Sequence, residues 1–140
     1  MPAVHLPSGE VTGFLVHKDS FGKSADGRQN VFYFTGDTIY LEEVADKIRQ
    51  KFHVVVALMN LGQALVPWPA KTDGPLQITM GGRDAAAPFR WLGADVLVPM
   101  HYESWTHFTE DGEALKKIFE EEGVSDRVFW LKGGEKVSIV

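Results

Sequence analysis

The sequence has no cysteine among its 140 residues. Disulfides and thiolate metal sites are therefore excluded, and a metal ion bound by this chain would take its ligands from His, Asp and Glu. The sequence also has no apolar run near the ~20 residues of a membrane-spanning helix. It does not begin with a basic region followed by an apolar stretch, as a signal peptide does. We expect a cytoplasmic protein that has no membrane partner.

Positive charge is scarce as well. Lys and Arg together number 14 against 19 Asp and Glu, which gives a formal net charge of −5. The sequence has no block of basic residues and no alternation of basic with aromatic residues, so we expect no nucleic-acid partner. The hydrophobic fraction of 44% and the charged fraction of 24% are ordinary for a globular protein. A chain of this length forms one core, which predicts a single domain over residues 1–140.

Strand-like and helix-like segments alternate along the chain. Residues 11–17 and 31–34 are rich in β-branched and aromatic residues and predict a hairpin with a long loop. Apolar residues at helical spacing predict a helix over 41–52, and a continuous apolar run predicts a buried strand over 53–61. The remaining predicted elements are a helix within 79–91 that Pro88 interrupts or delays, a strand over 96–100, a helix over 112–122, and terminal strands over 127–131 and 136–140. This order predicts an α/β fold with one mixed sheet and flanking helices.

Two of the apolar strands end in side chains that can bind a metal ion. The stretch "VFYFTGDT" ends at Asp37 and Thr38, and the stretch "VLVPMHY" reaches His101 just after its strand. Ligands of α/β proteins bind at the carboxyl ends of strands. A carboxylate with an imidazole suits zinc, manganese or iron. Taken alone, Asp37 is also typical of a turn or a helix cap. Taken alone, His101 is also typical of a histidine that makes a structural hydrogen bond. The occurrence of both residues at strand ends favours a metal site.

The sequence around these residues resembles a known family. "YFTGDT" is followed by a helical pattern, by an apolar strand ending in "MNLG", and by a stretch that runs from "ITMGGRDAAAPFRWLGADVL" into "VPMHYESWTHF". This order resembles the C-terminal half of the metallo-β-lactamase fold, in the branch of metal-dependent hydrolases that includes ascorbate-phosphate lactonase-like proteins. The resemblance implies half of an αββα sandwich. It also implies hydrolysis of an ester, lactone or phosphoester by water that a metal ion activates.

The resemblance implies three metal ligands in this chain. Asp37 corresponds to the Asp that bridges two metal ions in the family, and His101 corresponds to a His that binds one of them. His5, in "PAVHLPSGEVTGF", corresponds to an earlier His that binds the other ion. The alternative for His5, so near the start of the sequence, is a solvated side chain. Zinc is the expected metal, with manganese or iron as alternatives.

The His-x-His-x-Asp-His motif of the family is absent from this sequence. In the family this motif belongs to the N-terminal half and supplies most of the ligands. We therefore expect a hydrolase that is incomplete or inactive as an isolated chain, the alternative being a noncatalytic remnant or assembly subunit. Because the intact fold packs two sheets face to face, we expect a second copy or a partner chain to cover the apolar sheet face. A flavodoxin-like fold would instead need a Gly-rich phosphate loop, which does not follow the first strands.

Residues that follow His101 are candidates to surround the metal site. Thr38, next to Asp37, is another. Glu103 would orient the His101 ring by accepting a hydrogen bond, the alternative being a solvated surface residue. Tyr102, Trp105 and His107 would line a pocket for a small-molecule substrate. For His107 the alternative is that it only positions the helix that follows.

Overall fold

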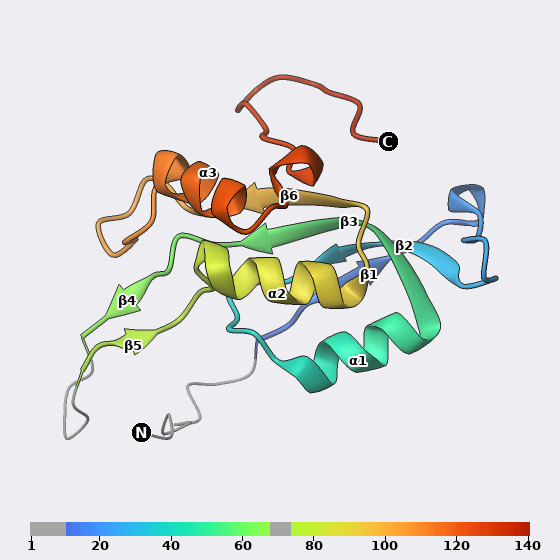
Figure 1. Cartoon of the computed structure of the whole chain (residues 1–140), viewed down its shortest axis with the longest axis horizontal. Coiled ribbons are helices and arrows are strands. Elements are labelled where there is room, and N and C mark those ends of the chain that lie inside the picture. The colour runs from blue at the N-terminus through green and yellow to red at the C-terminus, as the bar shows by residue number, and fades with distance from the viewer. Residues whose placement is uncertain (1–10, 68–73) are drawn as a thin grey trace.

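A mixed four-stranded sheet, in the order β1-β2-β3-β6, forms the centre of the computed structural model, which describes residues 11–67 and 74–140 (Figure 1). β1 (Phe14–Val16) is antiparallel to β2 (Gln29–Phe34). β2, β3 (Phe52–Asn60) and β6 (Val96–Met100) are parallel to one another. A ribbon of two short strands, β4 (Leu65–Val66) and β5 (Leu76–Gln77), projects from one end. The predicted α/β fold with one mixed sheet is confirmed.

Three helices pack on the same face of this sheet (Figure 1). They are α1 (Glu42–Lys51), α2 (Gly82–Leu92) and α3 (Gly112–Glu121), and two 3-10 turns, η1 (Asp19–Phe21) and η2 (Ser125–Arg127), complete the elements of the described residues. Each α-helix buries its apolar stripe in one shared core, to which Ile48, Phe89 and Phe119 contribute. None of the helices in the described ranges is long and apolar enough to cross a membrane.

The helix that Pro88 was expected to interrupt or delay begins before Pro88 and runs through it. α2 begins at Gly82, whose amide donates a hydrogen bond to Glu110 Oε2 at 2.7 Å. Pro88 has no amide hydrogen, so the carbonyl of Asp84, one turn earlier, loses its helical donor at a cost of about 3 kcal/mol. Burying a side chain such as Phe89 contributes about 1.5–3 kcal/mol. Because Phe89 and several neighbours in α2 are buried together, the interruption expected from the local sequence does not occur.

The terminal strands predicted over 127–131 and 136–140 do not form. The first segment makes only a single parallel bridge, between Leu97 and Val128, with the Phe129 amide donating to the Leu97 carbonyl at 2.8 Å. The second segment has no strand beside it and is largely exposed, Val140 by 71%. A two-stranded ribbon without a packed face is at best marginally stable, which explains why local β propensity does not suffice here.

The face of the sheet opposite the helices is apolar. The strand register places Phe14, Phe34, Leu58 and Val98 side by side in one row across all four strands. Val98, on the edge strand β6, is fully buried, whereas Phe14, on the opposite edge strand β1, is 61% exposed. We call this row and its parallel neighbour, Val16, Phe32, Val56 and Val96, the open face of the sheet.

The turn after β2 requires a glycine, which a matched pair of substitutions can test. Gly36 has φ +67°, and a Cβ there would lie 2.8 Å from the Thr12 carbonyl oxygen. Gly93 has φ +64° in a left-handed conformation, but a Cβ there would meet no atom within 4 Å. A left-handed conformation costs an L residue about 1–2 kcal/mol. We expect Gly93→Ala to lower the free energy of unfolding by about that amount and Gly36→Ala to lower it further, as measured by urea unfolding. Equal losses would contradict a steric role for Gly36.

Candidate metal site at the carboxyl edge of the sheet

Three neighbouring parallel strands bring polar side chains to one edge of the sheet. Asp37 follows β2, Asn60 is the last residue of β3, and His101 follows β6. Because the strands are parallel, their carboxyl ends lie at the same edge. A carboxylate, an amide and an imidazole therefore converge from segments that are distant in the sequence.

The two side chains predicted as metal ligands are in contact. Asp37 Oδ1 lies 3.1 Å from His101 Nδ1 and accepts a hydrogen bond from Asn60 Nδ2 at 2.8 Å. The side chain of His101 is 37% exposed and that of Asp37 is 50% exposed. The pair is thus formed by the fold and can be reached from solvent.

The backbone around Asp37 is anchored to β3. The Thr35 amide donates to the Leu58 carbonyl at 3.1 Å, and the buried Thr35 hydroxyl accepts from the Asn60 amide at 3.0 Å. The same hydroxyl donates to the Gly36 carbonyl at 3.0 Å, just where the chain turns with positive φ. These bonds extend the link between β2 and β3 beyond the last strand pair, so the position of Asp37 is tied to that of Asn60.

His101 is held in an uncommon backbone conformation. Its φ is +52°, a left-handed value that residues other than glycine seldom adopt and that occurs at functional sites. The Leu61 amide donates to the carbonyl of the preceding Met100 at 2.9 Å, which fixes the point where the chain leaves β6. The imidazole meets the Phe108 ring edge-on, with the ring centroids 5.1 Å apart. Backbone and ring contacts thus both direct the imidazole towards Asp37.

The geometry of the pair fits two ligands of one metal ion. Zinc binds His nitrogen and carboxylate oxygen at about 2.0–2.2 Å, so two tetrahedral ligands lie about 3.4 Å apart. The distance of 3.1 Å between Asp37 Oδ1 and His101 Nδ1 is close to this value. Within residues 11–67 and 74–140, however, no group of three or more His, Asp or Glu side chains could hold a metal ion. The described residues thus offer two potential donors, and His5, the third predicted ligand, lies outside the described residues.

The residues predicted to surround the pair point in several directions. The Thr38 hydroxyl donates to the Ile39 carbonyl at 2.9 Å, and Thr38 lines a cavity on the helix side of the sheet. The Glu103 carboxylate lies beside the first residue of α3, where its Oε1 would be 3.1 Å from a Cβ on Gly112. The partner of the His101 ring is thus Asp37, and no hydrogen bond joins Glu103 to His101 among the described side chains.

The aromatic residues after His101 divide into two groups. Tyr102 packs edge-on against Trp130, with centroids 5.8 Å apart, as part of the core. Burial raises the pKa of the Tyr102 hydroxyl, the Glu103 carboxylate raises it further, and Lys116 opposes the shift. The rings of Trp105 and His107 lie 6.1 Å apart, and Trp105 is 63% exposed. The His107 ring lies 4.8 Å from that of Phe108, which contacts His101.

Sequence reasoning assigned no role to Asn60. The available signal was a polar residue that ends an otherwise apolar strand within "MNLG". Its contact with Asp37 depends on the register between β2 and β3, which includes a shift between Val31 and Phe32.

The opposite edge of the sheet has a second His–Asp pair, with His53 Nε2 2.9 Å from Asp95 Oδ2. That pair joins the start of β3 to the residue before β6 and provides a natural control for the first.

The chain is similar in sequence to curated proteins named UPF0173 metal-dependent hydrolases, although no protein-family model matches it. The protein of Halobacterium salinarum is 28% identical over 131 residues, which cover 94% of this chain and 49% of the relative. The protein of Pyrococcus abyssi is 28% identical over 145 residues, which cover 99% of this chain and 53% of the relative. The chain therefore spans about half the length of the curated relatives that it matches.

Solved structures of hydrolases have a similar fold. An isothiocyanate hydrolase from Delia radicum gut bacteria matches with a TM-score of 0.66 and 23% identity, over 90% of this chain and 43% of that protein. Igni18, a metallo hydrolase from Ignicoccus hospitalis, matches with a TM-score of 0.58 and 23% identity, over 89% of this chain and 51% of that protein. The resemblance to metal-dependent hydrolases is thus confirmed: the chain has the fold of about half of a metallo-hydrolase.

Proposed function

We propose that this chain is the part of a metal-dependent hydrolase that supplies Asp37 and His101 to the metal centre. The observation that carries the proposal is the 3.1 Å contact between the two side chains at the carboxyl edge of the sheet. The names of the curated relatives support it. Zinc is the first candidate, because the donors are one oxygen and one nitrogen without thiolate, and manganese or iron are alternatives. His5 is the proposed third ligand, and the proposed substrate is a small ester, lactone or phosphoester.

Each residue at this edge has a distinct part in the proposal. Asp37 and His101 hold the ion, and Phe108 restrains the imidazole ring. Asn60 donates to Asp37 Oδ1 and so restrains the carboxylate beside His101, while this oxygen keeps a second lone pair for the ion. A bound ion would polarise the substrate and lower the pKa of a water molecule.

The open face supports the view that further ligands come from a second unit. Successive residues of a strand point to opposite faces, so Asn60 shares the open face with Leu58, two residues earlier. The Asp37–His101 pair contacts Asn60, so it lies at the end of this face. A unit that covered Phe14, Phe34 and Leu58 would therefore reach the pair. In this proposal that unit is a second copy of the chain or a partner chain that carries the other half of the fold.

A noncatalytic assembly subunit is the second candidate function. The observation that favours it is the two-residue donor set of the described part of the chain, combined with the apolar open face. In this case the open face would bind a partner and the Asp37–His101 pair would have no role in turnover. A cytoplasmic location stays a prediction for both candidates.

Metal binding tests the Asp37–His101 pair directly. After treatment with a chelator, the wild-type protein is expected to bind zinc, as measured by equilibrium dialysis and plasma mass spectrometry. His101→Ala should weaken binding at least ~10-fold, because even residues that only orient metal ligands contribute about that much. The control is His53→Ala, which removes the histidine of the other His–Asp pair. Equal loss in the two variants, or no zinc bound by the wild type, would contradict the proposed site.

Hydrolysis separates the two candidate functions. We expect the zinc-loaded protein, in the assembly that it forms in solution, to turn over members of a panel of esters, lactones and phosphodiesters. Asp37→Ala should abolish this turnover because it removes the carboxylate from the site. Assembly without any turnover on the panel would instead favour the noncatalytic subunit.

The mass in solution tests the open face. We expect light scattering to give at least twice the chain mass of 15.6 kDa. Phe14→Lys should shift the equilibrium towards the monomer at least ~10-fold, because it places a charge in an apolar interface. Trp91→Lys is the control, since Trp91 is similarly apolar and 43% exposed but belongs to α2, on the covered side of the sheet. A wild-type monomer would refute self-association.

A further inference from the structure

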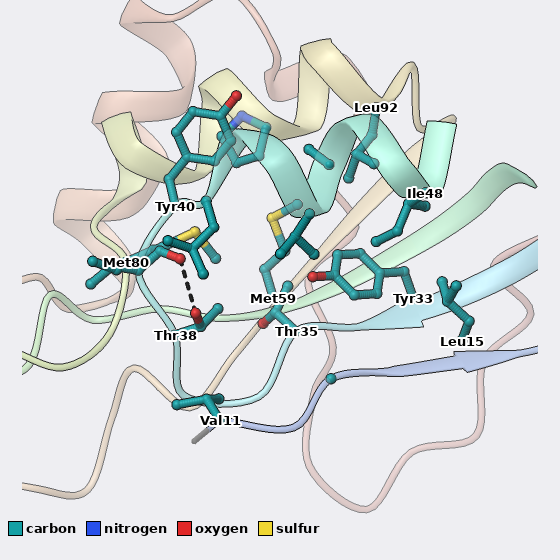
Figure 2. Close-up of a pocket in the computed structure, with 16 residues that line it drawn as sticks. Val11, Leu15, Tyr33, Thr35, Thr38, Tyr40, Ile48, Met59, Met80 and Leu92 are labelled. Atoms are coloured by element: carbon teal, nitrogen blue, oxygen red, sulfur yellow. Dashed lines mark hydrogen bonds between the residues drawn. The ribbon is translucent and has the colours of Figure 1, made fainter. Parts of the chain in front are cut away.

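A second potential site lies on the helix side of the sheet, away from the Asp37–His101 pair. A cavity of about 290 Å³ lies between β1 and β2, the loop after β2, and helices α1 and α2 (Figure 2). Its floor consists of the buried side chains of Ile48, Met59, Met80 and Leu92. At the rim, Val11 is 51% exposed. The cavity is thus apolar inside and open to solvent at one end.

The Tyr33 hydroxyl is the polar group that is best placed to contact a ligand in this cavity. The Thr35 and Thr38 hydroxyls donate to the backbone carbonyls of Gly36 and Ile39. The hydroxyls of Tyr33 and Tyr40, by contrast, have no hydrogen-bond partner among the described residues. Figure 2 shows the Tyr33 hydroxyl pointing between the lining side chains towards Met59 and the Tyr40 hydroxyl pointing away from Met59. Burial raises the pKa of the Tyr33 hydroxyl, so it stays protonated and can both donate and accept.

The charges around the cavity select against anions. None of the described residues that line it is charged. Burial, followed by the carboxylates of Glu42 and Asp46, raises the pKa of the Tyr40 hydroxyl, which also lines the cavity. Two carboxylates therefore lie near this part of the lining. A ligand that carried a carboxylate would lose hydration in an apolar site and would also meet repulsion.

The volume of the cavity limits the size of the ligand. An apolar cavity of about 150 Å³ stays dry and accommodates benzene. A cavity of about 290 Å³ therefore has room for roughly two fused rings or an alkyl chain of similar bulk. We propose that the cavity binds a small uncharged organic molecule of this size, whose single hydroxyl or carbonyl oxygen hydrogen-bonds to Tyr33.

The proposed ligand site is separate from the proposed metal site but touches the same loop. Thr35 and Thr38, which line the cavity, stand on either side of Gly36 and Asp37. Among the described residues, the cavity lining includes no His, Asp or Glu. Binding to the cavity can therefore be measured in the metal-free protein, and its outcome does not depend on the hydrolase proposal.

Titration calorimetry of the metal-free chain at pH 7 with three related probes tests the proposal. We expect saturable binding of 2-naphthol, weaker binding of naphthalene, which lacks the hydroxyl, and at least ~10-fold weaker binding of 2-naphthoate, which carries a charge. No saturable binding of 2-naphthol would overturn the proposal, and so would equal affinity for 2-naphthol and 2-naphthoate.

Two variants test whether the probes bind in this cavity. Tyr33→Phe keeps the ring and should remove the preference for 2-naphthol over naphthalene. Ala45→Leu adds bulk to the lining and should weaken both probes at least ~10-fold, because the added methyl groups occupy the space that the ligand needs. Ala87→Leu is the control, since Ala87 is exposed on α2 and does not line the cavity. Affinities unchanged by Tyr33→Phe and Ala45→Leu would overturn the proposal.

Discussion

The parallel pairing of β2, β3 and β6 is the constraint on which the rest of the structure depends. It forces the connections between these strands to cross the sheet, and the crossovers contain α1 and α2. The same pairing brings three carboxyl ends to one edge, where Asp37, Asn60 and His101 meet. Core and candidate site are therefore consequences of a single arrangement: the strands that bury Ala57 and Leu97 against the helices also carry the polar residues at their ends.

The two faces of the sheet have different roles because all three helices pack on one of them. On the covered face, strand residues such as Met59 contribute to a shared core, and that core is incomplete near β1, where the cavity lies. On the open face, Asn60 lies two residues beyond Leu58 along β3, past the last apolar row and in contact with Asp37. One sheet therefore serves two neighbouring but separate potential sites, one at its polar edge and one beneath its helices.

Local sequence patterns predicted much of this structure, and the failures occurred where non-local packing decides. The helix over 41–52 and the strand over 53–61 were found because their apolar periodicity reflects the faces that they bury. Pro88 was misread because local propensity does not include the burial of the helix around it. The terminal strands were predicted from β-rich composition, but a strand also needs a neighbour, and residues 136–140 have none.

The candidate site was predictable to a similar extent. The approach of Asp37 to His101 followed from the rule that strand ends hold ligands, which needs only the order of the elements. The contact of Asn60 with Asp37 depends on the exact register and could not be inferred from the sequence. The inward direction of Thr38 and the packing of Tyr102 on Trp130 likewise depend on how the chain turns after each strand.

The left-handed backbone at His101 has a consequence for how this position can evolve. Glycine adopts such a conformation without steric cost, whereas a residue with a Cβ is held there by the rest of the fold. Selection for folding stability alone would therefore favour glycine, or asparagine, at position 101. An imidazole there trades stability for a side chain of defined direction. If selection for the function of this edge were relaxed, we would expect His101 to be substituted early, whereas the buried strand residues would still be maintained by selection for stability.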